Sequence, residues 1–273
     1  MIDRFVTRQK EEWDLLRTNH RILAEAPHRD LGDGIRSQLV VYRKASASAD
    51  VDKALSGGRP CFLCRKNRPA EQGIMPWLDY EILLNPYPLH PMHLTVPSKS
   101  HQPQLIVGKA GDMMSLARML ADYLIFYNGP RCGASAPDHF HFQAVGRELA
   151  GPVLRLPFVD GSVRKQYPYI LLDNPTEARF SEIVGRLSAG DPEPMMNVMA
   201  VSMDGGVRMV IVPRVRHRPS CYGDLLVSPA SLEMLGLFSI SREEDFRRFD
   251  GEKAREILRE VCMSEKEFAR LEI

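Results

Sequence analysis

The feature that most constrains this chain is the run HFHFQAVG at residues 139–146, in which polar and apolar residues alternate. A period of two predicts a β-strand, because successive side chains of a strand point to opposite faces of a sheet. His139, His141 and Gln143 would then share one face, with the intervening apolar residues in a core on the other. The sequence therefore predicts a strand that presents two imidazoles and an amide in a row.

A loop of small residues precedes this strand. Residues 128–138 read NGPRCGASAPD, and small side chains allow backbone N–H groups to approach an anion closely. Asn128, Gly133 and Ser135 are the candidate substrate-binding residues of the loop, together with Gln143 of the strand. Imidazoles and an amide behind such a loop can bind one phosphoryl group. The alternative is a pair of hydrogen-bonded histidines on a surface strand, and we favour the phosphoryl site.

The rest of the chain predicts an α+β fold. Helical spacing of apolar residues predicts helices, and β-branched or aromatic runs bounded by turn residues predict strands. We expect helices over residues 9–23 and 112–127 and in the charged tail from 228, strands over 37–43, 80–85 and 93–97, and a polar loop over 45–58. Within the tail, Ser228 and Ser264 are the expected helix starts.

An octapeptide pattern recurs in the second half of the chain. Residues 96–103 and 212–219 both read V-P-x-x-x-H-x-P, and the same register aligns EILLN at 81–85 with NVMAV at 197–201. This repeat predicts an ancient duplication of an α+β unit. The glycine-rich loop and the paired histidines do not recur, so we expect the second half to be degenerate.

The repeat also places His217 at the position equivalent to His101, and Arg214, Arg216 and Arg218 beside it form a basic cluster in the second half. Guanidinium groups grip phosphates well, so the cluster either contacts a nucleotide or lies on a solvated turn. The sequence leaves both interpretations open.

Charge and hydropathy argue against several classes of protein. The 36 Lys+Arg and 35 Asp+Glu give a formal net charge of +1, without the bulk electrostatic attraction on which nucleic-acid binding depends. No apolar run approaches the ~18–20 residues of a membrane helix, and the first residues contain no apolar core of the signal-peptide kind. We therefore expect a cytoplasmic protein with no nucleic-acid or membrane partner.

The motif H-F-H-F-Q behind the loop G-A-S-A-P resembles the H-x-H-x-Q signature of the histidine-triad superfamily. The resemblance is to its transferase branch: galactose-1-phosphate uridylyltransferases, diadenosine tetraphosphate phosphorylases and, closest in the apolar spacers, GDP-hexose phosphorylases. It covers roughly residues 55–220. It implies a single uridylyltransferase-like unit over 1–273, made of a catalytic half (about 30–155) and a degenerate half (about 165–273), with antiparallel sheets and flanking helices.

The same resemblance implies that His141 is the catalytic nucleophile and that Gln143 assists it. A neutral imidazole can attack phosphorus, and an amide can donate to a phosphoryl oxygen but cannot shuttle a proton at neutral pH. We expect ping-pong transfer from a nucleoside diphosphate sugar, GDP-hexose favoured, to phosphate or a sugar 1-phosphate, by a monomer or homodimer. The alternatives are a diadenosine polyphosphate phosphorylase, a non-catalytic nucleotide sensor and a zinc-dependent interaction module.

Cys61 and Cys64 form a C-x-x-C pair, a spacing that redox turns and metal sites share. With His101 and His139 they make a Cys2His2 set whose order and type resemble the zinc ligands of bacterial uridylyltransferases. Four protein ligands leave no open position, which is typical of a structural zinc ion. We expect this zinc to fix the C-x-x-C turn beside the nucleophile, and a reduced pair without metal is the alternative.

The other histidines and cysteines have no partner pattern. We expect His20, His28, His90 and His93 to be surface residues or satisfied core residues, and the remaining cysteines to be small buried hydrophobes. Asp138 stands directly before the first histidine of the motif. A carboxylate at that position is expected to orient an imidazole.

Overall fold

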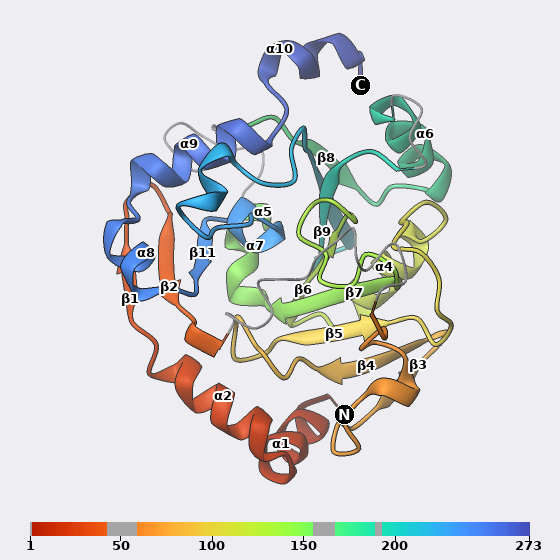
Figure 1. The fold of residues 1–273 in the computed structure, drawn as a ribbon. Helices are drawn as coiled ribbons and strands as arrows, with labels where there is room; N and C mark the ends of the chain where they lie inside the picture. The colour runs from red at the N-terminus through yellow and green to blue at the C-terminus, as the bar shows by residue number, and fades with distance from the viewer. Residues whose placement is uncertain (1, 43–58, 155–166, 189–192) are drawn as a thin grey trace.

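The computed structural model describes residues 2–42, 59–154, 167–188 and 193–273. Its centre is an antiparallel sheet of eight strands in the order β3-β4-β5-β7-β6-β9-β10-β8 (Figure 1). The strands are β3 (Met75–Trp77), β4 (Tyr80–Leu84), β5 (Leu94–Pro97), β6 (Tyr123–Asn128), β7 (His141–Gly146), β8 (Ile170–Asp173), β9 (Met196–Met203) and β10 (Gly206–Pro213). The predicted α+β class with antiparallel sheets and flanking helices is confirmed.

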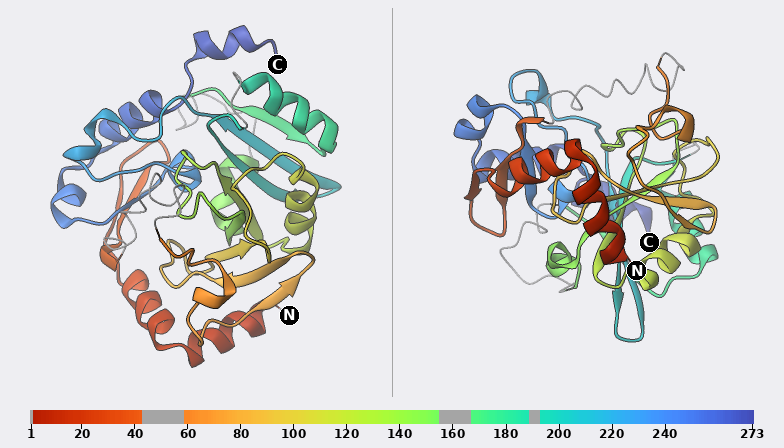
Figure 2. Two further views of the ribbon diagram at one scale, coloured as in Figure 1. Left: turned by 45° about the vertical axis from the view of Figure 1, so that its right-hand side comes forward. Right: turned by 90° about the horizontal axis from the view of Figure 1, so that it is seen from below.

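A second, three-stranded sheet joins an N-terminal hairpin to a strand of the C-terminal segment. β1 (His28–Asp30) pairs antiparallel with β2 (Arg36–Leu39), and β2 pairs in parallel with β11 (Leu237–Ile240). Figure 2 shows the red N-terminal elements beside the blue C-terminal ones from two further directions. Within the described residues, no helix combines the length and apolarity needed to cross a bilayer.

The central sheet separates two hydrophobic cores. One core contains Phe140 and Phe142 and packs against α4 (Ala110–Met119) and α6 (Glu177–Leu187). The other contains Val145 and packs against β11 and the C-terminal helices. Neighbouring residues of β7 therefore belong to opposite cores, which confirms the alternation that the sequence predicts.

Two predicted helices are wrong in extent. The helix over 9–23 is two helices, α1 (Ile2–Glu12) and α2 (Asp14–Ala24), because the chain bends at the buried Trp13, which has φ −117 and ψ 104. The helix over 112–127 ends at Met119, and β6 takes its place from Tyr123. Every residue of β6 is buried, and a continuous apolar run has no period that separates a helix from a buried strand.

The strand predictions are closer. β4 and β5 confirm the strands over 80–85 and 93–97, β2 is shorter than the predicted 37–43, and β7 begins at His141 instead of His139. The loop over 45–58 lies outside the described residues.

The tail contains a strand that the sequence did not predict. β11 is a short apolar run, and it lies among α7 (Ser231–Met234), α8 (Glu243–Arg248), α9 (Gly251–Val261) and α10 (Glu265–Phe268). Ser264 caps α10 in a capping box, as predicted, whereas the first tail helix begins at Ser231 instead of Ser228. The remaining short helices are α5 (Gly151–Leu154) and the 3-10 helices Arg65–Asn67, Arg147–Ala150, Ser220–Gly223 and Ala269–Leu271.

The repeated octapeptide corresponds to repeated strands. EILLN runs through β4 and NVMAV through β9, the V-P dipeptide ends both β5 and β10, and each pair of strands is an antiparallel ladder. After β10 the chain continues into the tail without a second pair resembling β6 and β7, as expected of a degenerate half. The two halves meet in the β6–β9 pairing. Their boundaries at about 30–155 and 165–273 stay a prediction.

Candidate active site and metal centre

His141 is the first residue of β7, and its imidazole is fully buried. Nδ1 lies 2.8 Å from the carbonyl oxygen of His139, so Nδ1 carries the ring hydrogen and donates it. Nε2 is buried and has no hydrogen-bond partner in the described part of the chain. Buried polar atoms without partners are rare, and here the unpaired atom is a nitrogen with an available lone pair.

Burial lowers the pKa of His141 to about 4, because the charged imidazolium is costly away from water. The hydrogen bond to the His139 carbonyl opposes this shift but does not outweigh it. The ring is therefore neutral near pH 7. Neutral imidazole is the nucleophilic form of histidine.

Gln143 lies on the same face of β7, and His93 holds its amide. His93 Nδ1 accepts a hydrogen bond from the backbone N–H of Leu89 at 3.1 Å, so the neutral ring carries its hydrogen on Nε2. That Nε2 donates to Gln143 Oε1 at 2.8 Å. The amide is thereby oriented with its Nε2 hydrogens as the end left for another acceptor.

His93 was expected to be a surface residue or a satisfied core residue, without a role in the site. His93 is buried, and it lies two residues before Thr95, which is opposite Gln143 in the β5–β7 ladder. Residues two apart on a strand share a face, so this register places His93 beside Gln143. A single sequence does not fix the register between two strands, which is why the contact was missed.

Asn128 and Gly133, two predicted substrate ligands, have structural partners. Asn128 Oδ1 accepts hydrogen bonds from Asn197 Nδ2, Ser231 N and Ser231 Oγ at 2.8, 3.0 and 2.7 Å, which leaves only its Nδ2 for a ligand. Gly133 has φ +93, and a Cβ there would lie 2.4 Å from the Cβ of Ala230. This close contact requires glycine whatever the loop binds. Their roles in substrate binding stay predictions.

Ser135 lies near a charged pair at the other end of the loop. Its carbonyl accepts a hydrogen bond from Arg59 Nη2 at 3.2 Å, and the same nitrogen lies 3.3 Å from Asp138 Oδ1. Asp138 Oδ2 lies 4.0 Å from His101 Nε2. Asp138 is thus beside an imidazole, as the sequence suggested, and the hydroxyl of Ser135 stays a predicted phosphate ligand.

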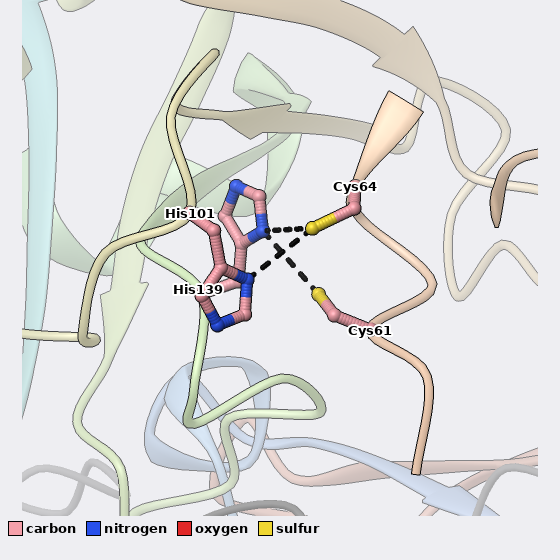
Figure 3. A group of neighbouring side chains, drawn as sticks. All are labelled: Cys61, Cys64, His101 and His139. Atoms are coloured by element: carbon pink, nitrogen blue, oxygen red, sulfur yellow. Dashed lines mark hydrogen bonds between the residues drawn. The ribbon is translucent and has the colours of Figure 1, made fainter. Parts of the chain in front are cut away.

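The four predicted metal ligands converge at one point (Figure 3). Their ligand atoms all lie within 4.8 Å of one another. Cys61 Sγ is 3.3 Å from His139 Nδ1, and Cys64 Sγ is 3.3 Å from His101 Nδ1 and 3.7 Å from His139 Nδ1. A tetrahedral zinc ion holds sulfur and nitrogen ligands about 3.6 Å apart, given its usual bond lengths. The donor set and its spacing fit a Cys2His2 zinc ion.

Neighbouring groups orient the ligand atoms of the cluster and influence their protonation. His139 Nε2 donates to the carbonyl of Ser98 at 2.8 Å, which leaves the Nδ1 lone pair facing the sulfurs. Burial raises the pKa of the Cys61 thiol to about 11, so a thiolate there requires a compensating cation. The C-x-x-C turn itself is held by Arg68, whose Nε donates to Leu63 O at 2.8 Å and whose Nη1 bonds the buried Glu81 carboxylate of β4.

Two arginines of the basic cluster in the second half, Arg214 and Arg216, are occupied by protein contacts. Arg214 is buried and donates to Asn197 Oδ1 at 2.7 Å and to the carbonyls of Arg216 and His217 at 3.0 and 3.3 Å. Arg216 pairs with Glu260 at 2.7 Å. These contacts favour a structural turn over a phosphate grip for Arg214 and Arg216, whereas Arg218 lies over the Tyr222 ring at 4.1 Å and its buried Nε has no hydrogen-bond partner among the described residues.

Comparison with solved structures identifies the fold. The crystal structure of yeast Ap4A phosphorylase Apa2 matches with a TM-score of 0.60 at 16% identity, over 92% of this chain and 98% of that one. The complex with AMP gives 0.59 at 15% identity, over 95% and 96%, and the complex with Ap4A gives 0.58 at 16%, over 92% and 97%. The chain therefore has the fold of yeast Ap4A phosphorylase Apa2, and diadenosine tetraphosphate phosphorylases are among the families that the motif resembles.

Two protein-family models match parts of the chain. The model described as "Domain of unknown function (DUF4922)" matches residues 5–146, and the model described as "GDPGP1-like, C-terminal domain" matches residues 181–272. The first covers just over half of the chain, so the chain belongs to the DUF4922 family. A search of curated proteins found no match.

Proposed function

We propose that this protein is a nucleotidyltransferase of the phosphorylase type, in which His141 Nε2 attacks the α-phosphorus of a nucleoside diphosphate sugar, GDP-hexose favoured. The observation that carries the proposal is the buried, neutral imidazole of His141, whose Nε2 has no partner among the described residues. The hydrogen bond from Nδ1 to the His139 carbonyl selects the tautomer that presents the Nε2 lone pair.

The reaction takes place in two steps at one phosphorus atom. Attack forms a bond between Nε2 and the α-phosphorus and breaks the bond to the bridging oxygen, which leaves with the β-phosphate as a sugar 1-phosphate. Inorganic phosphate then attacks the same phosphorus and releases the imidazole, giving a nucleoside diphosphate. The ring hydrogen stays on Nδ1 throughout, and Gln143 Nε2 donates to a non-bridging oxygen whose charge grows in both transition states.

Gln143 favours transfer over hydrolysis. A glutamine amide has no titratable proton, whereas hydrolases of the superfamily that this motif resembles carry a third histidine at this position. Water attacking the nucleotidyl-histidine therefore finds no general acid or base at that position. The intermediate should persist until phosphate or a sugar 1-phosphate reaches it.

A dinucleoside polyphosphate is the second candidate substrate. The fold similarity to yeast Ap4A phosphorylase Apa2, solved with Ap4A and with AMP, favours it. The chemistry at His141 would be the same, with a nucleotide as the leaving group. The match of residues 181–272 to the GDPGP1-like model supports phosphorylase chemistry for either substrate.

A structural zinc ion belongs to this proposal. Cys61, Cys64, His101 and His139 would hold it, and it would supply a tetrahedral cross-link without an open position for water. The backbone carbonyl of His139 accepts the Nδ1 hydrogen of His141. The metal ligand would therefore also fix the acceptor that selects the tautomer of the nucleophile.

Intact-mass spectrometry tests the activity. The protein is mixed with GDP-, UDP- and ADP-hexoses and with Ap4A, without phosphate, and quenched. We expect an acid-labile mass increase of one nucleoside monophosphate, largest with GDP-hexose. His141→Ala should abolish the increase, and His28→Ala, at an exposed histidine of β1, should retain it. Nucleotide binding without any adduct would instead indicate a non-catalytic sensor.

A further inference from the structure

The ladder between β6 and β7 stops before it reaches His141. Its last pair is Phe126 opposite Gln143, and the same register continued would place Asn128 opposite His141. The backbone N–H and C=O of His141 therefore lack the strand partner that other residues of β7 have. Buried backbone groups need partners, so another element has to supply them.

The side chain of Gln104 supplies the missing hydrogen-bond partners of the His141 backbone. Its Oε1 accepts the backbone N–H of His141 at 2.7 Å, and its Nε2 donates to the carbonyls of His141 and Asn128 at 3.0 and 3.1 Å. One amide thus satisfies both backbone groups of His141 and ties them to the end of β6. Gln104 comes from the loop between β5 and α4 and is completely buried.

Gln104 is itself held in place. Its carbonyl accepts a hydrogen bond from the Tyr127 hydroxyl at 2.8 Å, and its backbone N–H donates to Pro137 O at 3.4 Å. The Tyr127 hydroxyl also bonds the carboxyl group of Glu193. The backbone of Gln104 is therefore anchored on both sides, which holds its buried amide against His141 and Asn128.

We infer that Gln104 is a positioning residue for nucleotidyl transfer: it replaces the missing strand partner of His141 and so sets where the Nε2 atom lies. The inference rests on the proposed role of His141. The imidazole is attached to a backbone that Gln104 holds, and its Nδ1 is fixed separately by the His139 carbonyl. Loss of the Gln104 amide would let the backbone of His141 shift, while the hydrogen bond from His141 Nδ1 to the His139 carbonyl remains.

The test compares two buried glutamines. Gln104→Leu keeps the approximate size and removes all three hydrogen bonds, and Gln104→Glu keeps the acceptor but places a carboxylate against two carbonyls. The matched control is Gln9→Leu in α1, where a buried glutamine accepts a hydrogen bond from Gly73 N at 2.5 Å. For each protein we measure the single-turnover rate of nucleotidyl-His141 formation from GDP-glucose and from Ap4A, the affinity for GMP and AMP, and the melting temperature.

We expect both Gln104 variants to form the intermediate about 10²-fold more slowly, the cost of a misplacement of about 1 Å. Nucleotide affinity should change far less, and Gln9→Leu should keep the wild-type rate despite a loss of stability. Gln104→Leu at the control rate, or rates that follow melting temperature in all variants, would overturn the inference. Wild-type protein that forms no adduct would instead refute the proposed function.

A milder variant covers the case in which the Gln104 variants do not fold. Tyr127→Phe keeps the ring in the core and removes the hydroxyl that bonds Gln104 O. It should slow intermediate formation by a smaller factor, again without a matching loss of nucleotide affinity. An unchanged rate in a folded Tyr127→Phe protein would count against the positioning role.

Discussion

Replacing His93 with phenylalanine should release the amide of Gln143. Phenylalanine keeps the ring near Phe126, whose centroid lies 6.1 Å from that of His93, but it removes the hydrogen bonds to Gln143 Oε1 and Leu89 N. Two partly buried hydrogen bonds at about 1 kcal/mol each give a loss of about 2 kcal/mol. For a chain of this size the melting temperature should fall by roughly 4–8 °C.

The effect on catalysis should exceed the effect on stability. Without His93, the Gln143 amide can rotate by half a turn and present Oε1 to the phosphoryl group, so the donor is lost for much of the time. Complete removal of one such donor costs about 10²–10³-fold in rate, and partial loss should lower nucleotidyl transfer by roughly tenfold or more. The affinity for the nucleoside monophosphate should change little.

The assay is single-turnover formation of nucleotidyl-His141, followed by quenched-flow mass spectrometry. His90→Phe is the matched control, because His90 lies in the same link between β4 and β5 but contacts Gly146 N and Glu148 instead of Gln143. That variant should lose stability and keep its rate. If His93→Phe forms the intermediate as fast as His90→Phe, the proposed orientation of Gln143 is wrong.

Three further predictions address the metal, the acceptor and the pH dependence. Purified protein should contain one zinc per chain, and Cys61→Ser or His139→Ala should lower both zinc content and melting temperature because metal binding and folding are coupled; a zinc-free protein whose melting ignores chelators would refute this. Gln143→His should shorten the lifetime of the nucleotidyl-histidine in water and weaken transfer to phosphate, measured as the decay of the adduct without acceptor. Burial raises the pKa of Glu193 to about 7 from 4.5. The stability contributed by its protonated form is therefore fully present below pH 4.5 and is lost as pH rises through 7. Glu193→Gln should flatten the fall in melting temperature between about pH 5 and 8, and identical profiles for the two proteins would contradict the raised pKa of Glu193.

The strand that carries the candidate nucleophile could be predicted from the sequence because its residues belong to one local motif. The alternation in 139–146 fixes which side chains of β7 enter the core, and the structure bears this out from His141 onward. The four predicted metal ligands also come together, although they are spread over more than seventy residues. That prediction depended on the resemblance to uridylyltransferases, since the ligand spacing alone is not diagnostic.

The parts that could not be predicted depend on pairing between distant elements. The place of His93 beside Gln143 follows from the β5–β7 register, and the role of Gln104 follows from where the β6–β7 ladder ends. β6 was mistaken for helix because it is buried on both faces, which removes the alternation that marks a strand. Interstrand register and ladder length are properties of the folded sheet, and no local pattern encodes them.

The measurement that tests the central claim most directly is a phosphate chase of the nucleotidylated protein. Wild-type protein is treated with GDP-hexose or Ap4A, freed of excess nucleotide, and divided into samples with and without inorganic phosphate, while peptide mapping locates the modified residue. We predict an acid-labile nucleotide on His141 that persists in buffer. Phosphate should discharge it rapidly as the nucleoside diphosphate, which is GDP after treatment with GDP-hexose and ADP after treatment with Ap4A. A modified residue other than His141, turnover without any adduct, or equal decay in the two samples would contradict the account.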